Sequence, residues 1–137
     1  MPPTEDVRSV PRAEARSSLH KAQELVAAAE SALSEGRWNA AGLDAIHAGI
    51  CGADAALIAV AGVRSASKDH NVVVQLLTAR VRDFTAAQRR HLTGLLKEKN
   101  TVAHEGRPVT EMEARQLVDH GRRLVRWATE LVGRQLR

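Results

Sequence analysis

One run of 23 residues limits what this chain can fold into more than any other segment. Residues 40–62 read AAGLDAIHAGICGADAALIAVAG, and the apolar positions recur at helical spacing. The stripe consists of Ile46, Ile50, Ala53, Leu57 and Val60. It is interrupted by Gly42, Gly49 and Gly52. Each interior glycine costs a helix about 1 kcal/mol relative to alanine, so another helix must approach closely to compensate. We therefore predict that this run is the most buried helix of a helical bundle.

The composition of the whole chain favours the same fold class. Among 137 residues there is no tyrosine, one phenylalanine and two tryptophans, and most of the apolar content comes from alanine, leucine and valine. Domains rich in β-sheet rely on aromatic and β-branched residues instead. The length suits one domain that buries about two thirds of its unfolded surface. We expect a single all-α domain.

The segment before the central helix contains an arm and one amphipathic helix. We expect residues 1–10 to form a flexible N-terminal arm and residues 11–137 to form the domain. Ser9 is the expected cap of the first helix, which Gly36 closes at its C-terminal end. Asn39 is the expected cap of the central helix.

Three more helices follow a loop at residues 62–70. Residues 71–81 contain three consecutive valines that also suit a strand, but a lone strand has no partner, so we predict a short helix. Residues 86–104 form the fourth helix. Thr110 and Glu113 form a capping box that opens the last one. The prediction is a five-helix antiparallel bundle with short connections.

The charge of the chain permits a polyanionic partner without requiring one. The net charge is +4 and the pI about 10.0, with acidic and basic residues interspersed. Arg90 on the fourth helix and Arg122 and Arg126 on the last are the candidate RNA contacts, although a solvated helix face is the simpler explanation. Aromatic platforms for stacking bases are nearly absent, which argues against a single-strand binder that works by stacking.

The candidate catalytic residues lie at the end of the fourth helix, in the stretch KEKNTVAHEG. With about 100° of rotation per residue, one helix face carries five polar side chains. They are Arg90, Thr93, Lys97, Asn100 and His104. Lys99 falls close to the middle of the apolar face. An amine, an amide and an imidazole suit a phosphodiester, because the amine neutralises charge, the amide orients it and the imidazole moves a proton near neutral pH.

A second explanation of the same residues stays open. Asn100 and His104 can simply finish the helix by bonding to its last carbonyls. The remaining histidines offer no better site: His47 is expected to pack beside the apolar stripe, and His91 and His120 look like surface positions. Cys51 is expected to be a buried, inert thiol. With one cysteine and no Gly-rich phosphate loop, the sequence points to no metal or cofactor.

The location is expected to be cytoplasmic. Residues 1–11 lack the apolar core of a signal peptide, and no apolar run approaches about 18 residues, so we expect no membrane span.

Three stretches in order resemble the HEPN family of small helical bundles, especially stand-alone bacterial members. They are LDAIHAGICGADAALIAVAG, RSASKDHNVVVQLL and LLKEKNTVAHEGRPVTEMEAR, within residues 15–132. The resemblance implies a five-helix fold, a homodimer and a metal-independent ribonuclease, often a toxin silenced by a nucleotidyltransferase-like antitoxin. Active relatives carry an arginine, four to six residues and then a histidine, with two such motifs facing each other across the dimer.

Applied to this chain, the resemblance implies that His104 is the catalytic histidine and Asn100 the adjacent amide. The arginine is replaced by Lys99, or by Lys97, whose spacing from His104 also fits. Lysine keeps the charge but lacks the planar fork that grips phosphate at two points. Two functions remain open: a homodimeric ribonuclease, or a module that binds RNA or a protein without turnover.

Overall fold

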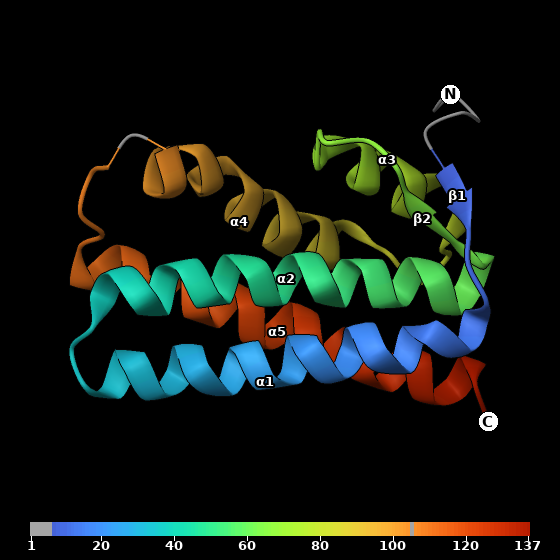
Figure 1. Ribbon diagram of the computed structural model, residues 1–137, viewed down its shortest axis with the longest axis horizontal. Helices are drawn as coiled ribbons and strands as arrows, with labels where there is room; N and C mark the ends of the chain where they lie inside the picture. Colours follow the sequence, from blue (N-terminus) through green and yellow to red (C-terminus); the bar gives the residue numbers. More distant parts are fainter. Residues whose placement is uncertain (1–6, 105) are drawn as a thin grey trace.

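The computed structural model describes residues 7–104 and 106–137, without the side chains of residues 100, 101, 103 and 104. Over these residues the chain forms five α-helices, one 3-10 turn and a two-stranded ribbon (Figure 1). The helices are α1 (Ala15–Ser34), α2 (Trp38–Ala61), α3 (Asn71–Arg80), α4 (Ala86–His104) and α5 (Glu111–Gln135). The short elements are β1 (Val7–Ser9), η2 (Arg12–Glu14) and β2 (Val63–Ser65). The predicted all-α bundle is confirmed.

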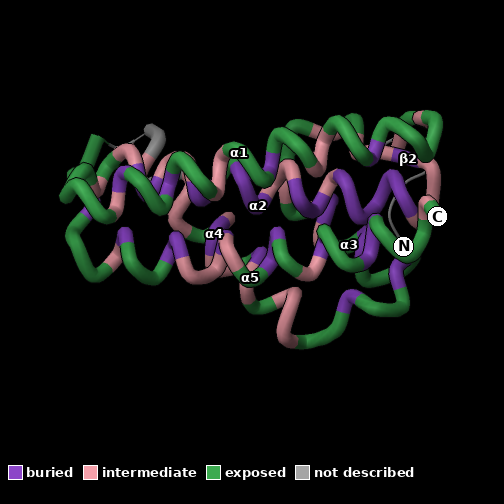
Figure 2. Tube along the Cα trace, turned by 90° about the horizontal axis from the view of Figure 1, so that it is seen from below, coloured by how far each residue is buried: buried purple, intermediate pink, exposed green. Residues whose placement is uncertain are grey.

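Helix α2 lies at the centre of the molecule. It packs against α1 and α5 on one side and against α3 and α4 on the other (Figure 1). The colours show that α1 runs antiparallel to both α2 and α5, and that α4 runs antiparallel to α5. Buried residues follow α2 along most of its length (Figure 2). The run that the sequence predicts to be most buried is therefore the core helix.

The glycines of α2 allow the neighbouring helices to approach. A Cβ on Gly42 would stand 3.3 Å from Leu117 on α5, and one on Gly52 would stand 3.3 Å from Val125 on the same helix. A Cβ on Gly49 would overlap the side chain of Leu95 on α4. Close packing of helices thus offsets the helix propensity that these glycines lose, as the sequence predicts.

Most predicted helix ends agree with the structure, and the caps agree in part. The capping box is present: the Thr110 hydroxyl accepts from the Glu113 N–H at 3.2 Å, and the Glu113 carboxylate accepts from the Thr110 N–H at 3.0 Å. The prediction that Asn39 caps α2 is wrong, because α2 begins at Trp38. The Asn39 side-chain Oδ1 instead accepts from the Val109 N–H at 2.8 Å, which ties the α4–α5 connection to the start of α2.

The two-stranded ribbon corrects two expectations. β1 pairs antiparallel with β2, with Arg8 opposite Arg64, so residues 7–9 of the predicted arm and residues 63–65 of the predicted loop form strands. Ser9 lies in β1 and does not cap a helix. The pairing continues where the Val10 N–H donates to the Gly62 carbonyl at 2.9 Å.

Helix α2 is also more apolar than expected. By length and composition it would pass for a membrane span, with a mean hydropathy of 1.5 over the best 18-residue window. However, 61% of that window is buried inside the bundle, as is typical of the core helix of a folded domain.

Candidate functional site

The predicted catalytic residues all lie on the last two turns of α4. The backbones of Asn100 and His104 are helical, but the placement of their side chains lies outside the described part of the chain. Lys97 and Lys99 are described. The surroundings of the predicted site are therefore described from these two lysines.

The two lysines line different hollows. Lys97 is exposed and lines a hollow of about 720 Å³, which we call the Lys97 hollow. Its walls are Asn71, Arg90, Thr93, Gly94, Leu96, Lys97 and His120. The sequence prediction that Arg90, Thr93 and Lys97 share one face is confirmed. Lys99 is half-buried, turned away from that face, and lines a second hollow.

This second hollow, the Lys99 hollow, holds two amines and two imidazoles. Its volume is about 330 Å³. Its walls come from α1, α2 and α4 and from the residue that precedes α3. They are Lys21, Leu25, His47, Ile50, Cys51, His70 and Lys99. His47 is exposed here, so the expectation that it packs beside the apolar stripe is wrong. Its place on α2 directs its side chain to the hollow.

A third, smaller hollow joins the other two. It is lined by Lys68, Asp69, His70, Asn71, Leu96 and Lys99 at the start of α3. It shares His70 and Lys99 with the Lys99 hollow, and Asn71 and Leu96 with the Lys97 hollow. The three hollows are therefore neighbours, and we call them together the lysine groove.

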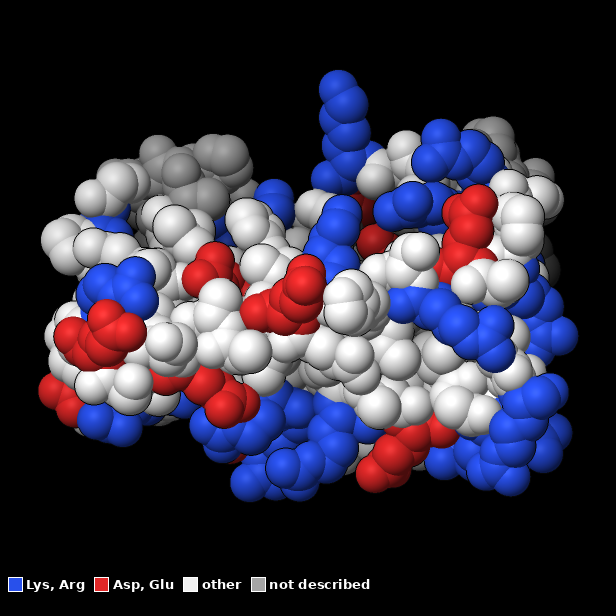
Figure 3. Space-filling model, turned by 60° about the horizontal axis from the view of Figure 1, so that its bottom comes forward, with Lys and Arg blue, Asp and Glu red and all other residues white. Residues whose placement is uncertain are grey.

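Every lysine of the chain lines the lysine groove. The four are Lys21, Lys68, Lys97 and Lys99. Among the described residues none of them forms an ion pair; the pairs are made by arginines and by His20. On the face drawn in Figure 3, basic and acidic groups lie next to one another, in keeping with the pairing of arginines with carboxylates. The groove is thus set apart by lysines that form no ion pair among the described residues, with Asp69 as the one carboxylate among the described residues that line it.

His70 brings an imidazole next to the Lys99 amine. It is the N-cap residue of α3, and the Asp69 carboxylate accepts from the Asn71 N–H at 2.9 Å, which fixes the start of that helix. Burial, with smaller contributions from the charges of Lys99 and His47, lowers the pKa of His70 from 6.5, against the opposing effect of Asp69. A neutral imidazole therefore faces the groove at pH 7, where it can accept a proton.

The end of α4 is fastened to α5 by Arg107. Its guanidinium donates to both carboxylate oxygens of Glu113, at 3.0 and 2.8 Å, and lies 3.8 Å from Glu98 on α4. The hydrogen bonds from Arg107 and from the Thr110 backbone lower the pKa of Glu113 to about 2. Arg107 therefore ties the segment that follows α4 both to α4 and to α5, next to the predicted site.

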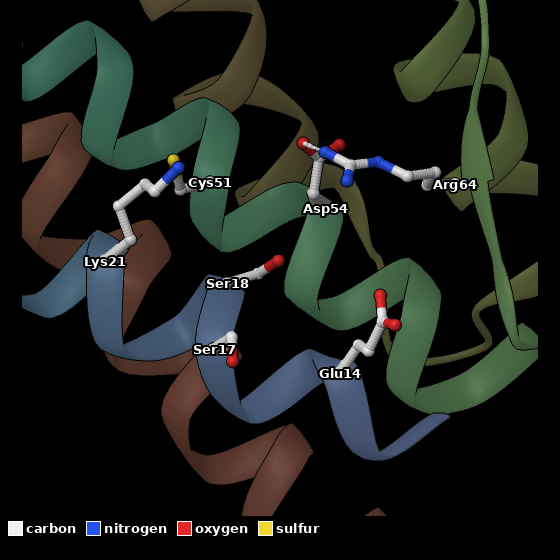
Figure 4. A pocket seen from close by; sticks show the side chains of 7 residues that line it. All are labelled: Glu14, Ser17, Ser18, Lys21, Cys51, Asp54 and Arg64. Atoms are coloured by element: carbon white, nitrogen blue, oxygen red, sulfur yellow. Dashed lines mark ion pairs between the residues drawn. The ribbon is translucent and has the colours of Figure 1, made fainter. Parts of the chain in front are cut away.

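A further pocket of about 370 Å³ adjoins the Lys99 hollow and shares Lys21 and Cys51 with it. Its remaining walls are Glu14, Ser17, Ser18, Asp54 and Arg64 (Figure 4). Arg64 reaches across from β2 to the Asp54 carboxylate at 3.6 Å. Burial, aided by the charge of Asp54, raises the pKa of the Cys51 thiol. The raised pKa leaves less of the reactive thiolate at neutral pH, as the sequence prediction of an inert thiol expects, but Cys51 is half-buried and not buried as predicted.

Two histidines between α4 and α5 form a pair that the sequence does not reveal. The Nδ1 atoms of His91 on α4 and His120 on α5 lie 3.0 Å apart, at hydrogen-bond distance. Both residues are half-buried, so the prediction that they are plain surface positions is wrong. The one hint in the sequence is Gly94, one turn beyond His91 on α4. Because Gly94 has no side chain, the His120 ring can lie over it.

The three predicted RNA-contact arginines are not brought together. Arg90 lines the Lys97 hollow. Arg122 turns toward α1, where its guanidinium donates to the Glu30 carboxylate at 3.3 Å. Arg126 is exposed on α5, one turn beyond Arg122. Only Arg90 therefore belongs to the groove.

The described residues contain no group of three histidine, cysteine or acidic side chains placed to hold a metal ion. No protein-family model, curated protein or solved structure matches this chain. We therefore infer the function from the groove and from the residues that line it.

Proposed function

We propose that this chain is an HEPN-like protein that binds RNA in the lysine groove and cleaves it without a metal ion. The observation that carries the proposal is the placement of all four lysines along the groove, where none of them forms an ion pair among the described residues. Such amines bind phosphate groups and release the counterions of the nucleic acid, which drives association.

Cleavage would use the hydroxyl group that RNA itself carries. The 2′-oxygen attacks the adjacent phosphorus atom, and its proton passes to the His104 imidazole. The bond from phosphorus to the 5′-oxygen breaks, and that oxygen takes up a proton from water, while His104 returns its proton to the solvent. A 2′,3′-cyclic phosphate and a 5′-hydroxyl are formed. Because Lys99 lies on a different face of α4 from Asn100 and His104, these groups would meet on one phosphate across the homodimer. Lys99 of one copy stabilises the added charge of the five-coordinate phosphorus, while Asn100 of the other copy orients a phosphate oxygen.

The surroundings of Lys99 support this chemistry. His70, whose imidazole is neutral at pH 7, lines the same hollow as Lys99 and gives the reaction a second proton acceptor in addition to His104. Lys97 faces the neighbouring hollow. We assign the catalytic charge to Lys99 and the binding of a flanking phosphate to Lys97 and Arg90.

The wider setting is proposed from the resemblance alone. Two copies would face each other as a homodimer, so that the two α4 ends form one composite cleft. The protein would act in the cytoplasm as a toxin, and a nucleotidyltransferase-type antitoxin would be its natural protein partner.

A second candidate function is RNA or protein binding without turnover. The residue identity at position 99 favours it, because lysine lacks the two-point grip on phosphate that arginine supplies. In that case the same groove holds the ligand, and His104 contributes no more than about 1 kcal/mol of stability at the helix end.

An RNA-cleavage assay in EDTA separates the two functions. The wild type is compared with His104→Ala and Lys99→Ala, and with His20→Ala as the matched control, since His20 is exposed on α1 and pairs with Glu24 outside the groove. The ribonuclease proposal expects cleavage by the wild type and the control, and loss of cleavage in both site variants. If none of the four proteins cleaves RNA at high concentration, although RNA still binds, the ribonuclease proposal is wrong and the chain is a binding module.

A further inference from the structure

The His91–His120 pair is built to hold its hydrogen bond in more than one protonation state. The Nδ1 atoms are 3.0 Å apart, and the ring centroids are 5.3 Å apart with the planes tilted by 57°. One Nδ1 must carry a hydrogen and the other must accept it. Both the neutral pair and the pair with one added proton meet this condition, whereas two imidazolium rings cannot. The pair can therefore take up one proton without breaking.

The packing around the pair keeps the rings in place. The His120 ring lies against Gly94 of α4, where a Cβ would stand 2.9 Å from Nε2. Any side chain at position 94 would push the ring away. Since His91 sits one turn before Gly94 on the same helix, α4 supplies both the hydrogen-bond partner and the space that His120 needs.

Only one ring of the pair faces the groove. His120 lines the Lys97 hollow, whereas His91 does not. His120 also lines an adjoining hollow of about 240 Å³ that includes Glu98, Glu113 and Gln116. An added proton on His120 would leave His91 as the acceptor, and the positive charge would point into the hollow that holds Arg90 and Lys97.

Burial and the neighbouring charges together keep the pair neutral at pH 7. Burial is the main reason that the pKa values of both histidines are lowered. Arg90 from α4 and Arg123 from α5 lower them further, and Asp119 from α5 opposes this effect. Lys97 shares the hollow, Glu98 and Glu113 flank it, and α3 contributes the uncharged Asn71.

We propose that the His91–His120 pair takes up one proton when a phosphate group of RNA occupies the Lys97 hollow. A phosphate beside Arg90 and Lys97 offsets the cations that disfavour a charged His120. The imidazolium then donates its Nδ1–H to His91 and adds its charge to the phosphate site. RNA binding and protonation of the pair are thereby coupled, so that pH regulates RNA binding at this site. This proposal rests on the function proposed above.

Calorimetry with inorganic pyrophosphate as the probe tests the coupling directly. The binding enthalpy at pH 7.0 is measured in several buffers of different ionisation enthalpy, and its slope gives the protons taken up. We expect uptake of up to one proton per site by the wild type and by the control His20→Gln, and none by His120→Gln. His91→Gln retains a hydrogen-bond acceptor and should retain the uptake, whereas His91→Leu should lose most of it.

Several results would overturn the proposal. They are absence of pyrophosphate binding, binding by the wild type without proton uptake, or equal uptake by wild type and His120→Gln. The same titration with a short single-stranded RNA is read separately. RNA binding without proton uptake contradicts the coupling alone, whereas proton-linked pyrophosphate binding without any RNA binding contradicts the RNA function alone.

Discussion

Two glycines of α5 provide a matched test of how closely α2 and α5 pack. Gly121 is buried against α2, where an added Cβ would stand 3.1 Å from the Ala45 carbonyl oxygen and 3.5 Å from its Cα. Gly133 lies on the same helix but is exposed, and a Cβ there would meet no other atom within 4 Å. Replacing each glycine with alanine adds the same methyl group in two different environments.

The expected stabilities follow from two opposing effects. Alanine in place of glycine favours a helix by about 1 kcal/mol, and by less near a fraying end such as position 133. At position 121 the methyl group meets backbone atoms that cannot rotate away, and overpacking of this kind costs about 1–3 kcal/mol. We therefore expect Gly133→Ala to raise the free energy of unfolding by about 0.5–1 kcal/mol. Gly121→Ala should lower it by up to about 2 kcal/mol.

Urea unfolding followed by circular dichroism at 222 nm measures both values. The comparison is made at equal m-values, so that the midpoints report stability rather than a change in the unfolded state. If Gly121→Ala were as stable as Gly133→Ala, the close approach of α2 and α5 would be refuted.

Three further predictions use local features. Thr110→Ala should lower the free energy of unfolding by about 1 kcal/mol in urea melts, since it removes the cap of α5. Glu113, whose pKa is lowered from 4.5 to about 2, adds stability above pH 4.5 that is lost as the pH falls toward 2, and Glu113→Gln should flatten acid-unfolding curves over that range. Because the pKa values of His91 and His120 are lowered from 6.5, the unfolded chain binds more protons below that pH. The melting temperature should therefore fall from pH 7 to 5.5, and fall less in the double variant His91→Gln/His120→Gln.

The fold could be predicted to a large extent because its signals are local. The spacing of apolar residues in α2 and the capping box of α5 depend on neighbours within one or two helical turns. The β1–β2 ribbon could not be predicted, because each strand has three residues and its partner lies far away in the sequence. Asn39 looked like a cap for the same reason: its actual partner, Val109, belongs to a distant connection.

The site was predictable only along single helices. Rotation about α4 places Arg90, Thr93 and Lys97 on one face, and they do line one hollow. The meeting of Lys99 with His70 depends on how α3 enters the bundle. The His91–His120 pair depends on the register between α4 and α5. Contacts of this kind between helices leave little trace in one sequence.

The salt dependence of RNA binding tests the lysine groove most directly. The affinity for a labelled single-stranded RNA is measured by fluorescence anisotropy at several salt concentrations. Each phosphate contact contributes about 0.7 to the slope of log affinity against log salt, so four lysine contacts predict a slope of magnitude about 3. Lys97→Gln and Lys99→Gln should each weaken binding and reduce the slope by about 0.7.

Arg37→Gln is the charge-matched control, because Arg37 is exposed, pairs with Glu35 and lies outside the groove. The account predicts that this variant binds RNA like the wild type while the lysine variants do not. Equal losses in all three variants would show that net charge alone attracts RNA and would contradict a specific groove, as would the absence of RNA binding by the wild type.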